Sequence, residues 1–159
     1  MRLRLSSTST RTFVLLPAAA LAEQAVARRP LRPRWLPVLL WGYLQYRLAG
    51  RYRIARAGGP PGLSQGYPDR LVTTGVYAHT RNPMYLGHLV FVTGLVLVTG
   101  SPVAVVALAV LGPWFDRRAA HDEERLARRF GRPYETYRDT VPRWLGRRAG
   151  PCSRDRATT

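Results

Sequence analysis

The feature that most constrains the fold is a run of 33 residues without a formal charge, Pro83–Phe115. A bilayer core about 30 Å thick is crossed by roughly 20 helical residues, so the run is long for one span and short for two. Gly100–Pro102 (GSP), near its middle, is typical of a turn. The run therefore predicts a membrane hairpin of helices, Met84–Thr99 and Pro102–Phe115, that borrow flanking residues to complete each crossing. The alternative is a buried β-hairpin or pair of core helices, since valine is abundant.

Charge sets the expected orientation and partners. The chain has 25 basic residues, all arginine, against 9 acidic ones, for a net charge of +16. Arg81, Arg117 and Arg118 flank the hairpin, which predicts that both of its ends face the cytoplasm. Such a charge also favours nonspecific binding to nucleic acid. Because the arginines stand beside apolar segments and no binding-motif spacing occurs, we expect the bilayer and its anionic lipids as partners, and no specific nucleic acid.

Residues 1–57 are expected to form membrane-associated segments joined by basic loops. Trp35–Tyr46 is uncharged over 12 residues, about 18 Å of helix, so it is either a short span with snorkelling arginines or an interfacial helix. Phe13–Ala22 is either a first membrane helix or part of a signal peptide, because Ala25–Ala27 (AVA) resembles a cleavage site. A Gly/Pro-rich loop at 58–68 separates this part from the cofactor-binding region at 69–145, and 146–159 reads as a disordered basic tail.

Two stretches carry residues suited to chemistry. Asp69–Gly87 combines aromatic and basic side chains with a proline at a helix start, a natural site for an anionic group; an interfacial aromatic belt is the alternative. Asp116–Trp144 holds the acid cluster Asp122–Glu124, which is either functional or part of an amphipathic surface helix with carboxylates paired to arginines. A hairpin would bring both stretches to one membrane face.

At these residues the sequence resembles the isoprenylcysteine carboxyl methyltransferase family and the related phospholipid methyltransferases. The family pattern runs roughly Leu-Val-Thr-x-Gly-x-Tyr, Arg-His-Pro-x-Tyr-x-Gly, a hairpin, paired acids, Phe-Gly-x-x-Tyr-x-x-Tyr and Val-Pro. The corresponding residues here are Leu71–Tyr77, Arg81–Gly87, Asp122–Glu124, Phe130–Tyr137 and Val141–Pro142. Together they cover about Asp69–Leu145. The resemblance implies an all-α, polytopic membrane enzyme of the cell membrane that uses S-adenosylmethionine.

The resemblance also implies roles for individual residues. Arg118 matches an arginine assigned to the substrate. The acid that holds the cofactor is Glu123 or its neighbour Asp122, so Arg118 and Glu123 are the predicted catalytic residues. The other predicted cofactor-binding residues are Asp69, Arg70, Leu71, Val72, Tyr77, Asn82, Pro83, Met84 and Tyr85.

One position departs from the pattern: Asn82 replaces the usual histidine. Asparagine donates and accepts hydrogen bonds but does not titrate, and His79 is a weak candidate to replace it. An acceptor carboxylate has a pKa near 4 and needs no base, whereas an amine must lose a proton. The stretches offer an arginine and no convincing base, so we expect a carboxylate or thiolate on a lipophilic or lipidated acceptor.

Other interpretations remain open. These are a phospholipid amine N-methyltransferase, an NADPH-dependent enzyme of the steroid-reductase type, and a non-catalytic basic membrane protein. The sequence supports no metal site, because His79, His88 and His121 are scattered. We expect His88 to face the hairpin interior or the pocket. The sequence does not indicate the oligomeric state.

Overall fold

The computed structural model describes residues 7–58 and 68–146. All regular structure in these ranges is helical, which confirms the all-α class; the β-hairpin alternative is wrong for them. The helices, of which η1 is a π-helix and η2 and η4 are 3₁₀-helices, are α1 (Thr8–Thr10), η1 (Arg11–Leu15), α2 (Leu16–Ala27), η2 (Pro33–Trp35), α3 (Leu36–Ala57), η4 (Gly75–Ala78), α4 (Pro83–Thr99), α5 (Pro102–Phe130) and α6 (Arg132–Thr140).

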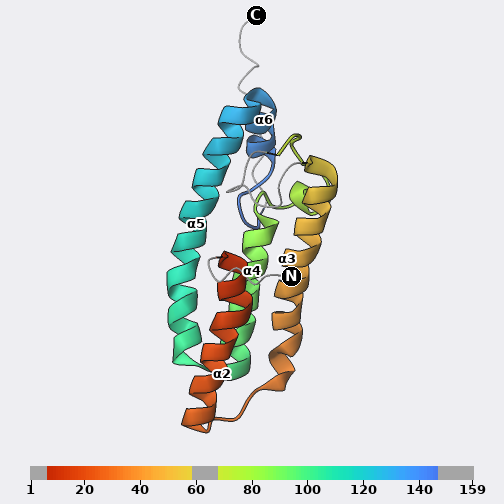
Figure 1. Cartoon of the computed structure of the whole chain (residues 1–159). Helices are drawn as coiled ribbons and strands as arrows, with labels where there is room; N and C mark the ends of the chain where they lie inside the picture. The colour runs from red at the N-terminus through yellow and green to blue at the C-terminus, as the bar shows by residue number, and fades with distance from the viewer. Residues whose placement is uncertain (1–6, 59–67, 147–159) are drawn as a thin grey trace, which may run out of the picture.

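The long helices lie side by side in an elongated bundle (Figure 1). Helices α3, α4 and α5 run along its length, and α2 packs beside them over the part farthest from α6. We call the end that holds α6, η4 and the start of α4 the α6 end, and the end that holds the α4–α5 turn the turn end. We call α1, η1 and α2 together the first helical stretch. The predicted segment Phe13–Ala22 lies in this stretch, and the predicted segment Trp35–Tyr46 lies in η2 and α3.

The predicted hairpin of helices is formed by α4 and α5. Gly100 makes the turn with a left-handed backbone (φ 61°), and the Ser101 side chain accepts a hydrogen bond from the amide of Ala104, as a helix cap. The second helix does not end at Phe115 as predicted but continues to Phe130. The reason is that nothing after Phe115 breaks a helix until Gly131, which adopts φ 57°.

A helix that crosses a membrane must be both long and apolar. Within residues 7–58 and 68–146, none of the helices combines enough length and apolar content to cross a membrane. Helix α4 has 17 residues, and α5 has 29 but is charged over its second half. The predicted complete crossing by each hairpin helix is therefore not found in the described part of the chain.

Helices α3 and α4 approach closely because glycines face the contact. A Cβ atom on Gly42 would lie 2.3 Å from the backbone nitrogen of Phe91, and one on Gly87 would lie 2.7 Å from that of Tyr46. No larger side chain fits at either position without moving a helix. This contact fixes α4, and hence the residues at its start, relative to α3.

The first helical stretch is joined to the turn end by polar contacts. The Glu23 carboxylate accepts a hydrogen bond from the Ser101 hydroxyl and pairs with Arg29 at 3.3 Å, and Arg29 donates to the Gly100 carbonyl. We call Glu23, Arg29, Gly100 and Ser101 the turn-end cluster. The signal-peptide alternative stays a prediction, as does the domain division; most of the predicted loop and the tail lie outside the described residues.

Candidate functional site

A cavity of about 530 Å³ lies toward the α6 end, at the start of α4. Its walls come from the first residues of the described chain, from α3, from the stretch before η4, and from α4, α5 and α6. All but one of the predicted site residues line it: Arg70, Leu71, Val72, Tyr77, Asn82, Pro83, Met84, Tyr85, Arg118, Asp122 and Glu123.

Asp69 is the predicted residue that does not line the cavity. It is exposed, and its carboxylate lies against Gly58, where an added Cβ would be 2.5 Å from Oδ2. The next residue, Arg70, donates its amide to the Ala57 carbonyl at 2.9 Å. The chain is thus attached to the end of α3 at this point, with Asp69 beside Gly58 and not among the cavity residues.

Asp122 is buried at the cavity wall, with 1% of its surface exposed. Its Oδ2 accepts a hydrogen bond of 2.5 Å from the Tyr85 hydroxyl and lies 3.6 Å from Nε of Arg118. Its Oδ1 lies 4.0 Å from a guanidinium nitrogen of Arg125 but accepts no hydrogen bond from the described residues. A buried carboxylate oxygen without a hydrogen bond is unusual, so Asp122 retains capacity for a ligand.

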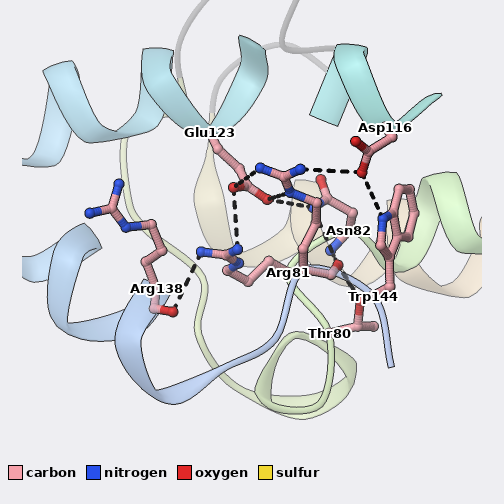
Figure 2. A network of polar contacts seen from close by, with 8 residues as sticks. Thr80, Arg81, Asn82, Asp116, Glu123, Arg138 and Trp144 are labelled. Carbon is pink, nitrogen blue, oxygen red and sulfur yellow. Dashed lines mark hydrogen bonds and ion pairs between the residues drawn. The ribbon is translucent and has the colours of Figure 1, made fainter. Parts of the chain in front are cut away.

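Glu123, the next residue, uses both carboxylate oxygens within the protein. Oε1 accepts hydrogen bonds from Nδ2 of Asn82 at 2.9 Å and Nε of Arg143 at 3.1 Å. Oε2 lies 3.3 Å from Nη2 of Arg143 and 3.3 Å from Nη2 of Arg81. Figure 2 shows the side chains of Arg81 and Asn82 beside Glu123. We call Arg81, Asn82, Glu123 and Arg143 the clasp.

The segment after α6 completes this network. The amide of Arg81 donates to the Pro142 carbonyl at 3.0 Å, and the Thr80 hydroxyl donates to the Arg143 carbonyl at 3.0 Å. The Trp144 indole donates to Asp116 at 2.9 Å (Figure 2). This hydrogen bond and the Arg143 guanidinium hold the pKa of Asp116 below its ordinary value.

Arg143 and Trp144 are site residues that the sequence analysis missed. The signal that could have found them is the need for cations around a buried acid cluster, together with the position of Arg143 directly after the Val-Pro match. The same network occupies Asn82, whose amide also donates to the Arg143 carbonyl at 3.4 Å. His79 is exposed and is not among the cavity residues, so it does not replace the missing histidine.

Three tyrosines form the cavity wall nearest α6. Tyr137 donates to the Tyr77 carbonyl at 2.7 Å, whereas the hydroxyl of Tyr134, 1% exposed, has no hydrogen-bond partner among the described residues. Burial raises the pKa of Tyr77 to about 12 and that of Tyr134 to about 12, so both hydroxyls stay protonated at neutral pH and remain donors.

The opposite part of the cavity is lined by rings. His88 is buried, as predicted, and stacks on Phe13 with ring centres 4.5 Å apart; Tyr46 and Phe115 also contact it. The Tyr46 hydroxyl shares a hydrogen bond of 2.7 Å with Ser9. His88 Nδ1 has no hydrogen-bond partner among the described residues. In the same residues there is no group of three or more His, Cys, Asp or Glu side chains that could hold a metal ion.

These features define a helical bundle in which a hairpin start and an acid pair enclose a ligand-sized cavity. Residues 47–132, 86 of the 159 in the chain, match the model of the phospholipid methyltransferase family, and the chain belongs to this family. The family membership predicted from the motifs is thereby confirmed.

Curated relatives carry a related name. A protein-S-isoprenylcysteine O-methyltransferase of Schizosaccharomyces pombe is 37% identical over 73 residues, which are 45% of this chain and 31% of that protein. Protein-S-isoprenylcysteine O-methyltransferase B of Arabidopsis thaliana is 36% identical over 74 residues, 46% of this chain and 38% of that one. The chain thus matches about a third of the length of these relatives. No solved structure matches it.

Proposed function

We propose that this protein is an S-adenosylmethionine-dependent methyltransferase whose acceptor is the carboxylate of a lipophilic, isoprenylcysteine-like molecule. The family membership and the names of the relatives support the reaction class. The observation that carries the proposal is the buried Asp122, which lines the cavity and whose Oδ1 accepts no hydrogen bond from the described residues.

The residues present fit the cofactor. S-adenosylmethionine carries a sulfonium cation, which a carboxylate and aromatic faces attract, and an adenosine part with several hydrogen-bonding groups. Asp122 would supply the negative charge, and the Tyr134 hydroxyl is a buried donor whose partner is not among the described residues. The cavity volume of about 530 Å³ lies within the range of roughly 300–1,000 Å³ common for small-molecule sites.

The chain's own residues would mainly align the reactants. The cofactor supplies an activated methyl group, so catalysis depends on orientation more than on acid or base chemistry. Tyr85, through its hydrogen bond to Asp122, holds this carboxylate at the cavity. Arg118, 34% exposed in its side chain, is placed beside Asp122 and would orient an acceptor carboxylate through a charge-assisted hydrogen bond.

The apolar surface supports a membrane setting. Large apolar side chains are exposed on α3, as at Leu40 (60%) and Trp41 (57%), and on α5, as at Val106 (62%) and Val110 (62%). Such surfaces mark membrane or protein contacts. In our proposal the apolar helices lie in the bilayer, in contact with anionic lipids, the α6 end faces the cytoplasm, and a lipophilic or lipidated acceptor reaches the cavity from the bilayer.

Cofactor binding tests the reaction class. We would measure S-adenosylmethionine binding by the detergent-purified full chain, with Asp122→Asn and Tyr134→Phe as variants. Glu124→Gln, which changes an exposed acid of the same helix, is the control. We expect saturable binding, weakened by about tenfold or more in Asp122→Asn and unchanged in the control. A folded wild type that binds no S-adenosylmethionine but is protected against heat by NADPH would replace the proposal with the reductase interpretation.

A second acceptor class is favoured by one observation. His88 lines the cavity, and its Nδ1 has no hydrogen-bond partner in the described part of the chain. A neutral imidazole there is a possible base for an amine acceptor, as on a phosphatidylethanolamine head group. Methyl transfer from S-adenosylmethionine to N-acetyl-S-farnesylcysteine and to phosphatidylethanolamine vesicles separates the two. Activity only on the amine lipid, lost in His88→Phe, would overturn the carboxylate assignment.

A further inference from the structure

The cavity shares a wall with a second hollow on its outer side. This hollow, of about 600 Å³, is more open, and Arg81 and Glu123 line both spaces. Their side chains are 4% and 8% exposed, and they pair at 3.3 Å. The Arg81–Glu123 pair is therefore part of the partition between the cavity and the outer hollow.

We propose that Arg143 is a positioning residue that keeps this partition closed and thereby sets how tightly and how long the cavity retains its ligand. The proposal rests on the proposed function for the identity of the ligand. Arg143 lies outside the segment that matches the family, and it lines the outer hollow but is not among the residues of the cavity. It would act through its neighbours and not by touching the reactants.

The geometry requires an arginine. Its Nε and Nη2 atoms reach the two oxygens of Glu123 at 3.1 and 3.3 Å, and its Nη1 reaches Asp116 at 3.2 Å. Asp116 and Glu123 stand about two turns apart on α5, so one guanidinium joins two points of this helix. A lysine ammonium is a point charge and cannot make the same planar, forked set of hydrogen bonds.

The backbone of the same segment fixes the start of α4. The Arg143 carbonyl accepts hydrogen bonds from Thr80 and from the Asn82 amide, and the Pro142 carbonyl accepts one from the amide of Arg81. Asn82 immediately precedes α4, whose residue Tyr85 donates to Asp122. A displacement of Arg143 is thus passed on to the carboxylate that we assign to the cofactor.

The clasp also gives different roles to the adjacent acids Asp122 and Glu123. Successive residues of an α-helix point about 100° apart, so Asp122 and Glu123 face different surroundings. Both oxygens of Glu123 are taken by the clasp, whereas Oδ1 of Asp122 is not hydrogen-bonded by the described residues. In this assignment Asp122 contacts the ligand, and Glu123 is a positioning residue through which Arg143 acts.

The test compares Arg143→Lys and Arg143→Ala with Arg128→Ala. Arg128 lines the same outer hollow but is exposed and not part of the clasp, so its variant controls for lost charge. The full chain in detergent would be assayed for S-adenosylmethionine affinity, for the dissociation rate, for thermal stability, and for hydrogen exchange of the peptide that contains Arg81 and Asn82.

We expect both Arg143 variants to exchange faster at Arg81, to bind about tenfold more weakly or worse, and to release the cofactor faster. Arg143→Lys should do so at a nearly unchanged melting temperature, which a purely structural role would not produce. Unchanged exchange in Arg143→Ala, or equal effects of Arg128→Ala, would overturn the proposal. Faster exchange in the Arg143 variants of a chain that binds no cofactor would retain the closed partition and reject the proposed function instead.

Discussion

The clasp and the turn-end cluster are built from the same chemistry at opposite ends of the bundle. Each contains an arginine–glutamate ion pair, and in each an arginine donates to a backbone carbonyl. They differ in burial: the side chains of Arg29 and Glu23 are 46% and 22% exposed, those of Arg81 and Glu123 only 4% and 8%. Water screens the charges of the exposed pair and can solvate them when the pair is broken. The charges of the buried pair have little water around them and are stabilised mainly by neighbouring protein groups.

The clasp and the turn-end cluster also differ in what lies next to them. The clasp borders the cavity and an outer hollow, while the residues of the turn-end cluster line neither. Glu23 and Arg29 precede the segment that matches the family, and three of the four clasp residues lie within it. The comparison indicates that the clasp serves the cavity, and that the turn-end cluster holds the first helical stretch against the hairpin.

The largest expected effect is at Glu123. Glu123→Ala removes the carboxylate that pairs with the buried Arg81 guanidinium, and breaking a buried pair in this way typically costs about 3–5 kcal/mol. Reversible chemical unfolding in detergent measures it. Glu124→Ala, at an exposed position on the same helix, should change the free energy of unfolding by less than about 0.5 kcal/mol. Equal unfolding midpoints for the two variants would mean that the buried Arg81–Glu123 pair contributes no more to stability than an exposed acid of the same helix.

Alkaline pH offers a second test at the α6 end. Because burial raises the pKa of Tyr77 to about 12 from 10, the folded state favours the neutral phenol. The stability this contributes is fully present below pH 10 and is lost as the pH rises from 10 to 12, by about 2 kcal/mol. Unfolding at pH 8, 10 and 12 measures it, and Tyr77→Phe should lose less over this range. An equal loss in that variant would show that another group titrates.

The region between the two ends is held by close helix packing. Gly42→Ala should cost about 1–3 kcal/mol, because its Cβ would press on the α4 backbone at Phe91. Gly112→Ala is the control: it also lies in a helix, but a Cβ there meets nothing within 4 Å. Because the gain in helix propensity is offset by the following Pro113, we expect a change of less than about 0.5 kcal/mol. Thermal unfolding that ranks the two variants the other way would contradict the observed α3–α4 contact.

Local signals explain why much of the fold was predictable. The Gly100–Pro102 turn lies within the uncharged run, so the two signals together predict the helix pair without knowledge of distant contacts. The end of α5 was misplaced because a change from apolar to charged residues at Asp116 was interpreted as a boundary. A helix ends where its backbone is interrupted, which here is Gly131, and not where its exposure to water changes.

Ion pairs and hydrogen bonds between residues far apart in the chain could not be predicted from the sequence. With 25 basic and 9 acidic residues, each acid has several possible partners, and nothing local assigns Arg143 to Glu123 or Trp144 to Asp116. The motifs did place most predicted residues around one cavity, because the hairpin joins their two stretches. Asp69 lies outside this cavity, against Gly58 at the end of α3, and its predicted role stays a prediction. Whether the cavity residues bind the cofactor stays a prediction.

The smallest expected effect is at the turn end. Glu23→Gln removes a partly exposed ion pair with Arg29, which is worth about 0–1 kcal/mol, and glutamine can still accept the hydrogen bond from Ser101. We expect a shift in the unfolding midpoint much smaller than that of Glu123→Ala, and no change in cofactor affinity. Raising the salt concentration should weaken the wild-type contribution further, because exposed charges are screened. A loss as large as at Glu123 would mean that burial does not separate the two clusters, and that the turn end also supports the cavity.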